Sequence, residues 1–413
     1  MIEEVVKSAK NAFNKTMNAS GESKNRVLEN IAKILEEKQD YVFEANLKDL
    51  ENAKKLLEEN KINLSTYNRL KLDKNKMRDM IQGLYDLIKL GDPVNNIIWE
   101  KELDKDLILK KVSTPIGIIG IIFEARPDCI IQISSLIIKS GNCAVLKGGS
   151  ESIETNKVLF EIIREALKKA DYPLDTINLV FTRDDVKEML AYDKYIDLII
   201  PRGSNSLVKY IKENTRIPVL GHASGICHIF VDKNASEDEV NKIIVDAKTQ
   251  YPSACNAVET ILIHKDYPYF ASLKEALKEA GVEIIENPES YSIEYGDKKL
   301  SLKVVNNAEE AIEHINKFGS GHTDSILSNN KENIEKFMNY VDSASVFANC
   351  STRFSDGFRY GFGAEVGIST NKTHSRGPVG LEGLTIYKYK LYGSNNIVED
   401  YTSGKKQFHH KMI

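Results

Sequence analysis

The chain is poor in cysteine, has a single tryptophan and carries no long hydrophobic run. Its five cysteines form no CxxC pair, which argues against a disulfide framework and against a zinc site. Sparse free thiols are typical of a reducing compartment, so we expect a cytoplasmic protein. The first residues lack the basic start and apolar block of a signal peptide. The longest apolar runs, residues 116–123 and 130–138, fall well short of the ~18 residues that cross a membrane.

An excess of one charge is missing as well. The 56 basic and 60 acidic residues leave a net charge of -4, so no overall field favours nucleic acid as a partner. The hydrophobic share of 42% is that of an ordinary globular protein. Because 413 residues exceed what one hydrophobic core usually holds, we expect two or three domains.

The hydrophobic pattern changes along the chain. Apolar residues spaced by three and four predict helices over residues 1–90, and residues 97–112 are predicted to form a protruding hairpin. From residue 115 onward, strands alternate with helices, which predicts parallel, doubly wound α/β sheets. The predicted strands are 116–123, 144–147, 177–181 and 195–200, then 226–231, 257–264, 302–305 and 324–327 in a second unit. The predicted helices between them are 128–139, 152–170, 184–191, 204–214, 238–248, 269–280 and 309–317.

Cys255 is the candidate nucleophile. It lies among small and polar residues, just before the apolar run 257–263. A structural cysteine usually lies inside an apolar run, as Cys129, Cys143 and Cys227 do. An accessible thiol at the start of a strand could instead attack an acyl carbon. An inert core thiol is the alternative interpretation.

Polar residues follow three of the predicted strands. Glu124, Arg126 and Asp128 come after the first strand, where open α/β sheets bind ligands. Two further loops combine a cation with small residues that could approach a phosphate, although neither is a GxGxxG or Walker pattern. These loops contain Lys147, Gly148 and Gly149, and Arg202, Gly203 and Ser204. Ordinary charged turns are the alternative for each.

Two later segments are rich in glycine. Residues 221–228 allow close backbone approach; their His222 and His228 could bind a metal, but no third ligand lies nearby, so no metal site is expected. Residues 361–384 contain Ser369, Ser375 and Arg376, which could hold a small anion, or could turn tightly at a junction.

Taken together, these segments resemble the gamma-glutamyl phosphate reductase family, a branch of the aldehyde dehydrogenase superfamily, over residues 5–393. The most specific matches are residues 123–128, 146–151, 221–228, 251–260, 319–324, 362–370 and 375–384. The resemblance implies two Rossmann-like α/β domains and a small β element for oligomerisation. It implies an NADP-binding domain over 1–228 with the hairpin 97–112, to which 354–368 returns, a catalytic domain over 229–353 and an oligomerisation strand and tail over 369–413.

The resemblance also implies a reaction: NADPH reduces L-glutamyl 5-phosphate to L-glutamate 5-semialdehyde and phosphate, for proline biosynthesis. Cys255 would form a thioester, and the product would cyclise to 1-pyrroline-5-carboxylate. The cofactor would contact Lys147 and its glycines, the loop at Arg202, and Glu294. For the substrate, the candidates are Glu124, Arg126, Asp128, His322, Ser375 and Arg376. A separate glutamate 5-kinase would supply the substrate, and we expect a homodimer or a dimer of dimers.

One absence favours a reductase. Aldehyde oxidisers of the superfamily carry a glutamate base upstream of the cysteine, at a spacing that falls on Gly221 here, and residues 221–225 contain no carboxylate. Asp128 stands where the superfamily has an oxyanion-side asparagine, and an ionised aspartate would repel an oxyanion. Alternatives are a thiol-dependent reductase acting on acyl-CoA, and a non-catalytic protein that kept the fold.

Overall fold

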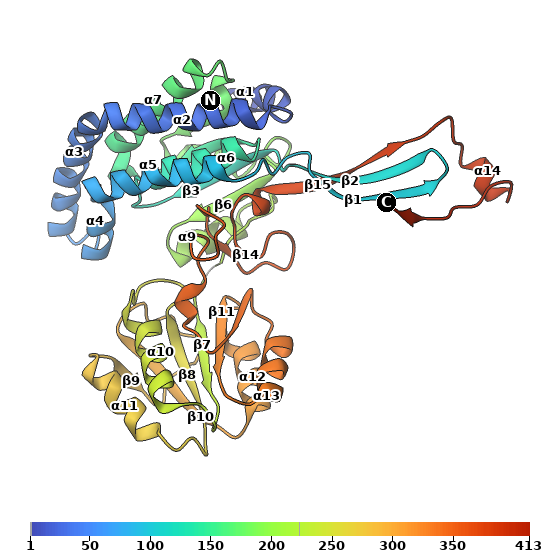
Figure 1. The fold of residues 1–413 in the computed structure, drawn as a ribbon. Coiled ribbons are helices and arrows are strands. Elements are labelled where there is room, and N and C mark those ends of the chain that lie inside the picture. The colour runs from blue at the N-terminus through green and yellow to red at the C-terminus, as the bar shows by residue number, and fades with distance from the viewer. Residues whose placement is uncertain (1, 223) are drawn as a thin grey trace. The chain divides into compact units, whose positions relative to one another are not determined.

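The computed structural model describes residues 2–222 and 224–413. Met1 and Ala223, which belongs to the glycine-rich segment 221–228, lie outside the described residues. Two compact units make up the chain (Figure 1). The first holds the chain up to Gly203 with Ile211–Val219 and Gly380–Ile413, and the second holds Ser204–Tyr210 and Leu220–Val379.

The N-terminal part of the first unit is helical, as the apolar spacing predicts. The helices are α1 (Ile2–Thr16), α2 (Gly21–Glu37), α3 (Gln39–Glu58), α4 (Leu64–Leu70) and α5 (Lys74–Lys89). Side chains cap several of them: Ser20 accepts from the N–H of Ser23, and Asp73 from that of Lys76. The repeat of Val27, Leu28, Ile31 and Leu35 buries one face of α2 completely.

A four-stranded parallel sheet forms the centre of the first unit. Its strands are β3 (Ile118–Phe123), β4 (Cys143–Lys147), β5 (Ile177–Val180) and β6 (Leu198–Arg202), in the order β5-β4-β3-β6. The connecting helices are α6 (Cys129–Lys139), α7 (Ile153–Lys169) and α8 (Arg183–Met189), and α9 (Asn205–Glu213) follows β6. The strand order reverses beside β3, so the crevice between the carboxyl ends of β3 and β6 is the expected ligand position.

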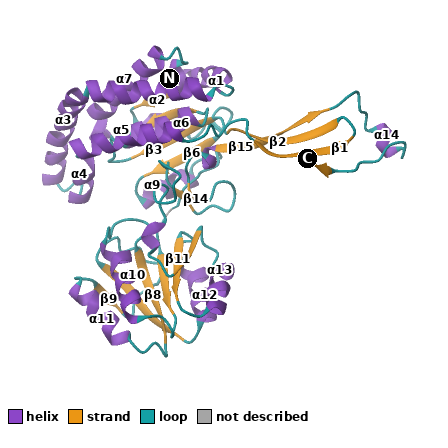
Figure 2. Cartoon of the chain, in the orientation of Figure 1, coloured by secondary structure: helices purple, strands orange, loops and turns teal. Residues whose placement is uncertain are grey.

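A separate antiparallel sheet belongs to the same unit. It has the order β15 (Thr385–Tyr392), β2 (Leu107–Pro115), β1 (Ile97–Asp104) and β16 (Lys411–Met412), and its three long strands stand out in Figure 2. The predicted hairpin is confirmed, with Asp106 at positive φ in the turn. β15 pairs with β2 along its whole length and leaves large apolar side chains exposed, among them Tyr389 and Leu391.

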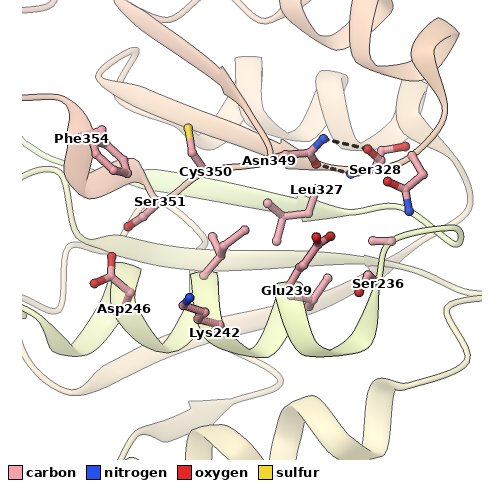
Figure 3. A pocket seen from close by; sticks show the side chains of 14 residues that line it. Ser236, Glu239, Lys242, Asp246, Leu327, Ser328, Asn349, Cys350, Ser351 and Phe354 are labelled. Carbon is pink, nitrogen blue, oxygen red and sulfur yellow. Dashed lines mark hydrogen bonds between the residues drawn. The ribbon is translucent and has the colours of Figure 1, made fainter.

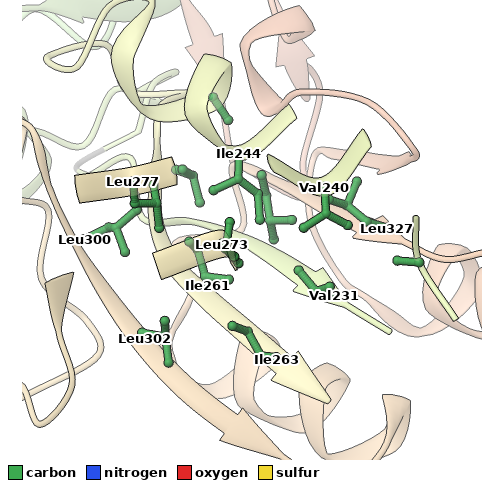
Figure 4. Packing of buried hydrophobic residues seen from close by; sticks show 14 of the residues in the cluster. Val231, Val240, Ile244, Ile261, Ile263, Leu273, Leu277, Leu300, Leu302 and Leu327 are labelled. Atoms are coloured by element: carbon green, nitrogen blue, oxygen red, sulfur yellow. The ribbon is translucent and has the colours of Figure 1, made fainter. Parts of the chain in front are cut away.

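The second unit is built on six parallel strands. Their order is β12 (Ser345–Ala348), β11 (Thr323–Leu327), β7 (Cys227–Val231), β8 (Val258–His264), β10 (Lys299–Val305) and β9 (Glu283–Ile285). The helices α10 (Glu237–Thr249) and α11 (Phe270–Glu279) bury Ile244 and Leu273 against Ile261 of β8 (Figure 4). Apolar residues of α12 (Ala308–Phe318) and α13 (Lys331–Tyr340) cluster with Phe230 and Leu262, which reach the other face of the sheet.

The unit boundaries differ from those expected. Residues 220–228 belong to the second unit, because β7 lies between β8 and β11 in its sheet. Residues 354–368 also group with the second unit, since the side chain of Asn256 donates to the carbonyl of Ser355 and the N–H of Val366 donates to that of Val379. The chain re-enters the first unit only at Gly380.

Several element boundaries also differ from the prediction. β6 begins at Leu198 instead of residue 195, because residues 192–195 form a hydrogen-bonded turn. Several elements of the second unit were missed, namely β9, α13, β12 and the short antiparallel pair β13 (Ile368–Ser369) and β14 (Gly377–Pro378). Among the described helices, none is long and apolar enough to cross a membrane.

A buried ion pair fixes the loop before β10. The Lys248 ammonium lies 2.9 Å from a carboxylate oxygen of Glu259, and both side chains are fully buried. Glu259 also accepts hydrogen bonds from the backbone N–H groups of Tyr295 and Gly296. Burial raises the pKa of Glu259 to about 7 and lowers the pKa of Lys248.

Removing one partner of the buried Lys248–Glu259 pair should destabilise the fold. We expect Lys248→Met to lower the free energy of unfolding by ~3–5 kcal/mol, because it leaves a buried carboxylate without its cation. The folded chain then binds a proton at Glu259 more readily than the unfolded chain, so the variant should regain stability as the pH falls through the raised pKa. Denaturant unfolding at several pH values measures both effects.

Lys299→Met is the matched control, because Lys299 forms an exposed pair with Glu283 in the same sheet. Its loss should change the stability much less than the loss of Lys248 does, because exposed ion pairs contribute little. Equal losses in the two variants would contradict the role assigned to the buried pair.

Candidate active site

Cys255 lies in a turn between α10 and β8 and is partly exposed. The predicted core positions of Cys129, Cys143 and Cys227 are confirmed, since all three are fully buried. Burial raises the pKa of Cys129 to about 11 and of Cys143 to about 12, and it raises the pKa of Cys227 well above its ordinary value. These three thiols therefore stay protonated and unreactive.

The glycine-rich segment 221–228 packs against the backbone of Cys255 through Gly225. A Cβ added at Gly225 would lie only 2.5 Å from the Cα of Cys255, so only glycine fits there. The thiol of Cys227 donates to the carbonyl oxygen of Cys255 at 3.3 Å. Among the described residues, the backbone N–H of Cys255 donates to no protein acceptor. An N–H group left over in this way can stabilise a negatively charged oxygen.

Two histidines lie beside the thiol. One ring nitrogen of His222, one of His322 and the sulfur of Cys255 all lie within 4.8 Å of one another. The two rings meet edge to face, with centroids 4.9 Å apart. His322, a predicted substrate residue, is fully buried, while His222 is partly exposed. His228 takes no part, because it is buried against Asp324, which accepts from its backbone N–H.

Arg353 is a buried cation of the second unit that sequence reasoning missed. It lies in the short 3-10 helix Thr352–Phe354, is 8% exposed and donates from Nε to Gln250 at 2.9 Å. Burial lowers the pKa of Arg353, as does the Arg359 charge, while the negative charge of a Cys255 thiolate raises it. A negative charge at the sulfur and the positive charge of the guanidinium therefore favour each other. In the sequence, Arg353 is a single arginine in a polar segment that follows β12, a strand that was not predicted, so nothing distinguished it there.

The thiol and its neighbours share one edge of the sheet. Gly225 precedes β7, Cys255 precedes β8 and His322 precedes β11, so they gather at the amino ends of three adjacent parallel strands. Arguments from sheet topology place ligands at the carboxyl ends and could not predict this position.

In the first unit, the predicted loops do lie at the carboxyl edge. β3 separates β4 from β6, and its Phe123 pairs with Arg202 while Ile122 pairs with Lys147. The Lys147 loop and the Arg202 loop thus follow β4 and β6, the two strands on either side of β3. The loop that contains Glu124 follows β3 and lies between them. The backbone N–H of Glu124 donates to the carbonyl of Arg202 at 3.0 Å.

The glycines of the Lys147 loop are required by packing. A Cβ at Gly148 would lie 3.1 Å from the Phe123 ring and would overlap the amide of Asn156. A Cβ at Gly149 would overlap the carboxylate of Glu151, which accepts from the N–H of Ala125 at 2.6 Å. Backbone N–H groups in a glycine loop that leads into a helix can approach a phosphate.

The remaining predicted residues are divided between the units. Arg126 and Asp128 precede α6, with Asp128 at its N-cap and making no capping bond, and Gly203 follows Arg202. In the second unit, Ser204 lies close to Ser206, and the carboxylate of Glu294 accepts from the side-chain amide of Asn205 at 2.8 Å.

The two predicted anion-binding residues near the C-terminal end of the second unit differ in their surroundings. Ser375 is buried. Arg376 is exposed and donates from Nη2 to the carboxylate of Asp342 at 3.0 Å, so one side of its guanidinium is already occupied.

A cavity of about 550 Å³ in the second unit contains none of these residues (Figure 3). One face of α10, with Glu239 and Asp246, forms one wall, and Cys350 lies on the other. Asn349 and Ser328 are joined there by two hydrogen bonds. Burial raises the pKa of the Cys350 thiol, which therefore stays protonated.

The sequence of this chain is similar to known proteins of one family. The model of the aldehyde dehydrogenase family matches residues 1–295. A gamma-glutamyl phosphate reductase of Brachyspira hyodysenteriae is 57% identical over 99% of this chain and 99% of its own length. One of Acetivibrio thermocellus is 53% identical over 100% and 98%. The chain belongs to the aldehyde dehydrogenase family, in its gamma-glutamyl phosphate reductase branch.

Solved structures agree with that membership. A gamma-glutamyl phosphate reductase of Thermotoga maritima has a TM-score of 0.91 at 37% identity, covering 96% of this chain and 99% of that one. The NADP complex of a glyceraldehyde-3-phosphate dehydrogenase of Methanocaldococcus jannaschii has a TM-score of 0.71 at 16% identity, covers 95% and 94%, and shows the fold alone. The predicted aldehyde dehydrogenase fold is thus confirmed, and the chain is an oxidoreductase of this family.

The close approach of Gly225 to Cys255 can be tested without any substrate. We expect Gly225→Ala to cost ~1–3 kcal/mol of stability and to change the alkylation rate of Cys255, because the added Cβ displaces its backbone. Denaturant unfolding and iodoacetamide labelling, mapped by mass spectrometry, measure the two effects. Gly83→Ala in α5 is the control, since nothing lies within 4 Å of a Cβ there. Unchanged stability and an unchanged alkylation rate of Cys255 in Gly225→Ala would refute the packing argument.

Proposed function

We propose that this chain reduces L-glutamyl 5-phosphate to L-glutamate 5-semialdehyde and phosphate, with NADPH, through a thioester on Cys255. The observation that carries the proposal is a partly exposed thiol within 4.8 Å of two histidine nitrogens, in a chain 57% identical to a gamma-glutamyl phosphate reductase. The product then cyclises to 1-pyrroline-5-carboxylate, as a step of proline biosynthesis.

One of the two histidines beside Cys255 takes the thiol proton as the reaction begins. The sulfur attacks the acyl carbon, and the carbon–oxygen bond to phosphate breaks, so that phosphate leaves with the bonding electrons. A thioester remains on Cys255. The backbone N–H of Cys255 is free to stabilise the oxyanion that forms during the attack.

The thioester must then be reduced and not hydrolysed. When bound, NADPH supplies the hydride for that reduction. The sulfur leaves the resulting thiohemiacetal and the aldehyde is released. Gly221, the position of the water-activating glutamate in aldehyde oxidisers, offers no base, which favours reduction over hydrolysis.

The family uses nicotinamide cofactors, and we propose NADPH for this chain. The cations of Lys147 and Arg202 at one sheet edge support an extra phosphate on the cofactor. Gly148, Gly149, Gly203 and Ser204 would let the backbone approach it. Glu294 would hold the nicotinamide ribose.

For the substrate, Arg353 joins the residues predicted from the sequence. Its buried, positively charged guanidinium suits the phosphate or the glutamyl carboxylate. Ser375 and Arg376 remain proposed anion ligands and His322 a proposed substrate contact. Glu124, Arg126 and Asp128 remain proposed from the carboxyl edge of the first sheet.

Partners and location stay proposals as well. A separate glutamate 5-kinase would supply the unstable acyl phosphate. The exposed edge strand β15, with Tyr389 and Leu391, supports pairing between copies in a homodimer or a dimer of dimers. Free cysteines support a cytoplasmic location.

The reaction is tested with glutamyl phosphate generated in situ, against CoA thioesters as competing substrates. We expect turnover with the acyl phosphate, and loss of all measurable reduction in Cys255→Ala because no acyl acceptor remains. NADPH binding, followed by fluorescence, should persist in that variant. Turnover of thioesters alone would refute the substrate, and an active Cys255→Ala would refute the nucleophile.

The role of Arg353 makes a separate prediction. Removing a charged hydrogen-bond donor usually costs ~1.5–3 kcal/mol, so we expect Arg353→Gln to raise KM for the acyl phosphate by ~10- to 100-fold while the Kd of NADPH stays unchanged. Arg164→Gln, which removes an exposed arginine of the first unit, is the control and should leave KM unaltered. A loss of stability with unchanged KM would assign Arg353 a structural role only.

A further inference from the structure

We propose that Cys255, His222 and His322 form a binding site for a thiophilic divalent metal ion such as Zn²⁺, and that the ion blocks the thiol reversibly. The three donor atoms lie within 4.8 Å of one another, although their residues are far apart in the sequence. One thiolate and two imidazoles are a donor set that Zn²⁺ prefers, and three protein ligands leave a fourth position open for water.

The histidine on the exposed side is already oriented for such a ligand role. Nδ1 of His222 lies 2.8 Å from the carbonyl oxygen of Ile368, and a carbonyl can only accept, so Nδ1 carries the hydrogen. The lone pair of the neutral ring is then on Nε2. Metal-binding histidines usually donate their other N–H to a carbonyl or carboxylate in this way.

His322 gives an independent indication of a missing ligand. It is fully buried, and its Nε2 has no hydrogen-bond partner within the described part of the chain. Nδ1 lies 2.8 Å from the hydroxyl of Thr323 and can donate to it, which leaves the lone pair on the unpartnered nitrogen. A buried polar atom without a partner is costly, and a bound ion would remove that cost.

Neighbouring groups set the number of ligands at three. The thiol of Cys227 is fully buried and donates to the carbonyl of Cys255. His228 is held by Asp324. Coordination releases the Cys255 proton to solvent and involves no change of oxidation state, so a chelator should reverse it.

The ion would compete with acylation, because a metal-bound thiolate cannot attack the acyl carbon. That consequence rests on the proposed role of Cys255, whereas metal binding itself does not. The test therefore measures binding directly, with Co²⁺ as a spectroscopic replacement for Zn²⁺.

The test is a titration of Co²⁺ into the full chain after treatment with a chelator. The expected result is a thiolate-to-cobalt charge-transfer band at one equivalent, absent in Cys255→Ser and present in Cys350→Ser, whose thiol is also partly exposed. His222→Gln should weaken the affinity by at least ~10-fold, since even a lost hydrogen-bond partner of a ligand costs a metal site that much. His409→Gln in the C-terminal tail is the control for adventitious imidazole binding and should change nothing.

A second measurement covers variants that fold poorly. Zn²⁺ should slow iodoacetamide labelling of Cys255 in the unmodified chain, and EDTA should restore it. Cobalt binding without the charge-transfer band, a band that survives Cys255→Ser, or labelling of Cys255 that ignores Zn²⁺ would each overturn the proposal. A site confirmed by these measurements in a chain that does not reduce glutamyl phosphate would refute the proposed reaction and leave the metal site standing.

Discussion

The backbone contact between Gly225 and Cys255 is the constraint on which the second unit depends. The segments before β7 and β8 approach so closely that no side chain fits between them. The parallel pairing of these two strands, and of β7 with β11, then fixes where each segment enters the sheet. The thiol of Cys255 and the two histidines beside it lie next to that contact, so the packing of the backbone also positions the reactive group.

The two sheets use opposite edges. In the first unit, cations and glycines follow the strands, at the carboxyl edge that suits a phosphate-bearing ligand. In the second unit, the reactive side chains precede the strands. A glycine is required at both edges, at Gly148 and at Gly225, because backbone and side chains must come together there without a Cβ. The same residue type therefore serves two different edges of similar sheets.

Sequence reasoning predicted what depends on local pattern. The N-terminal helices, the hairpin and most strands follow from apolar spacing, and Cys255 stood out because it lies outside an apolar run. The missed elements are short or polar: β9 has three residues, and α13 buries only Phe337. The strand order, the unit boundary before Leu220 and the grouping of His222 and His322 with Cys255 depend on long-range pairing, which single residues do not reveal.

The return of the chain at Gly380 has a consequence for synthesis on the ribosome. The second unit is complete once Val379 has emerged, whereas the first unit still lacks β15, which pairs with β2 over eight residues. The N-terminal helices and the first parallel sheet are made before β15 and wait for it. Until β15 has emerged, β2 exposes a free strand edge, so the first unit is open to wrong pairing between nascent chains during that interval.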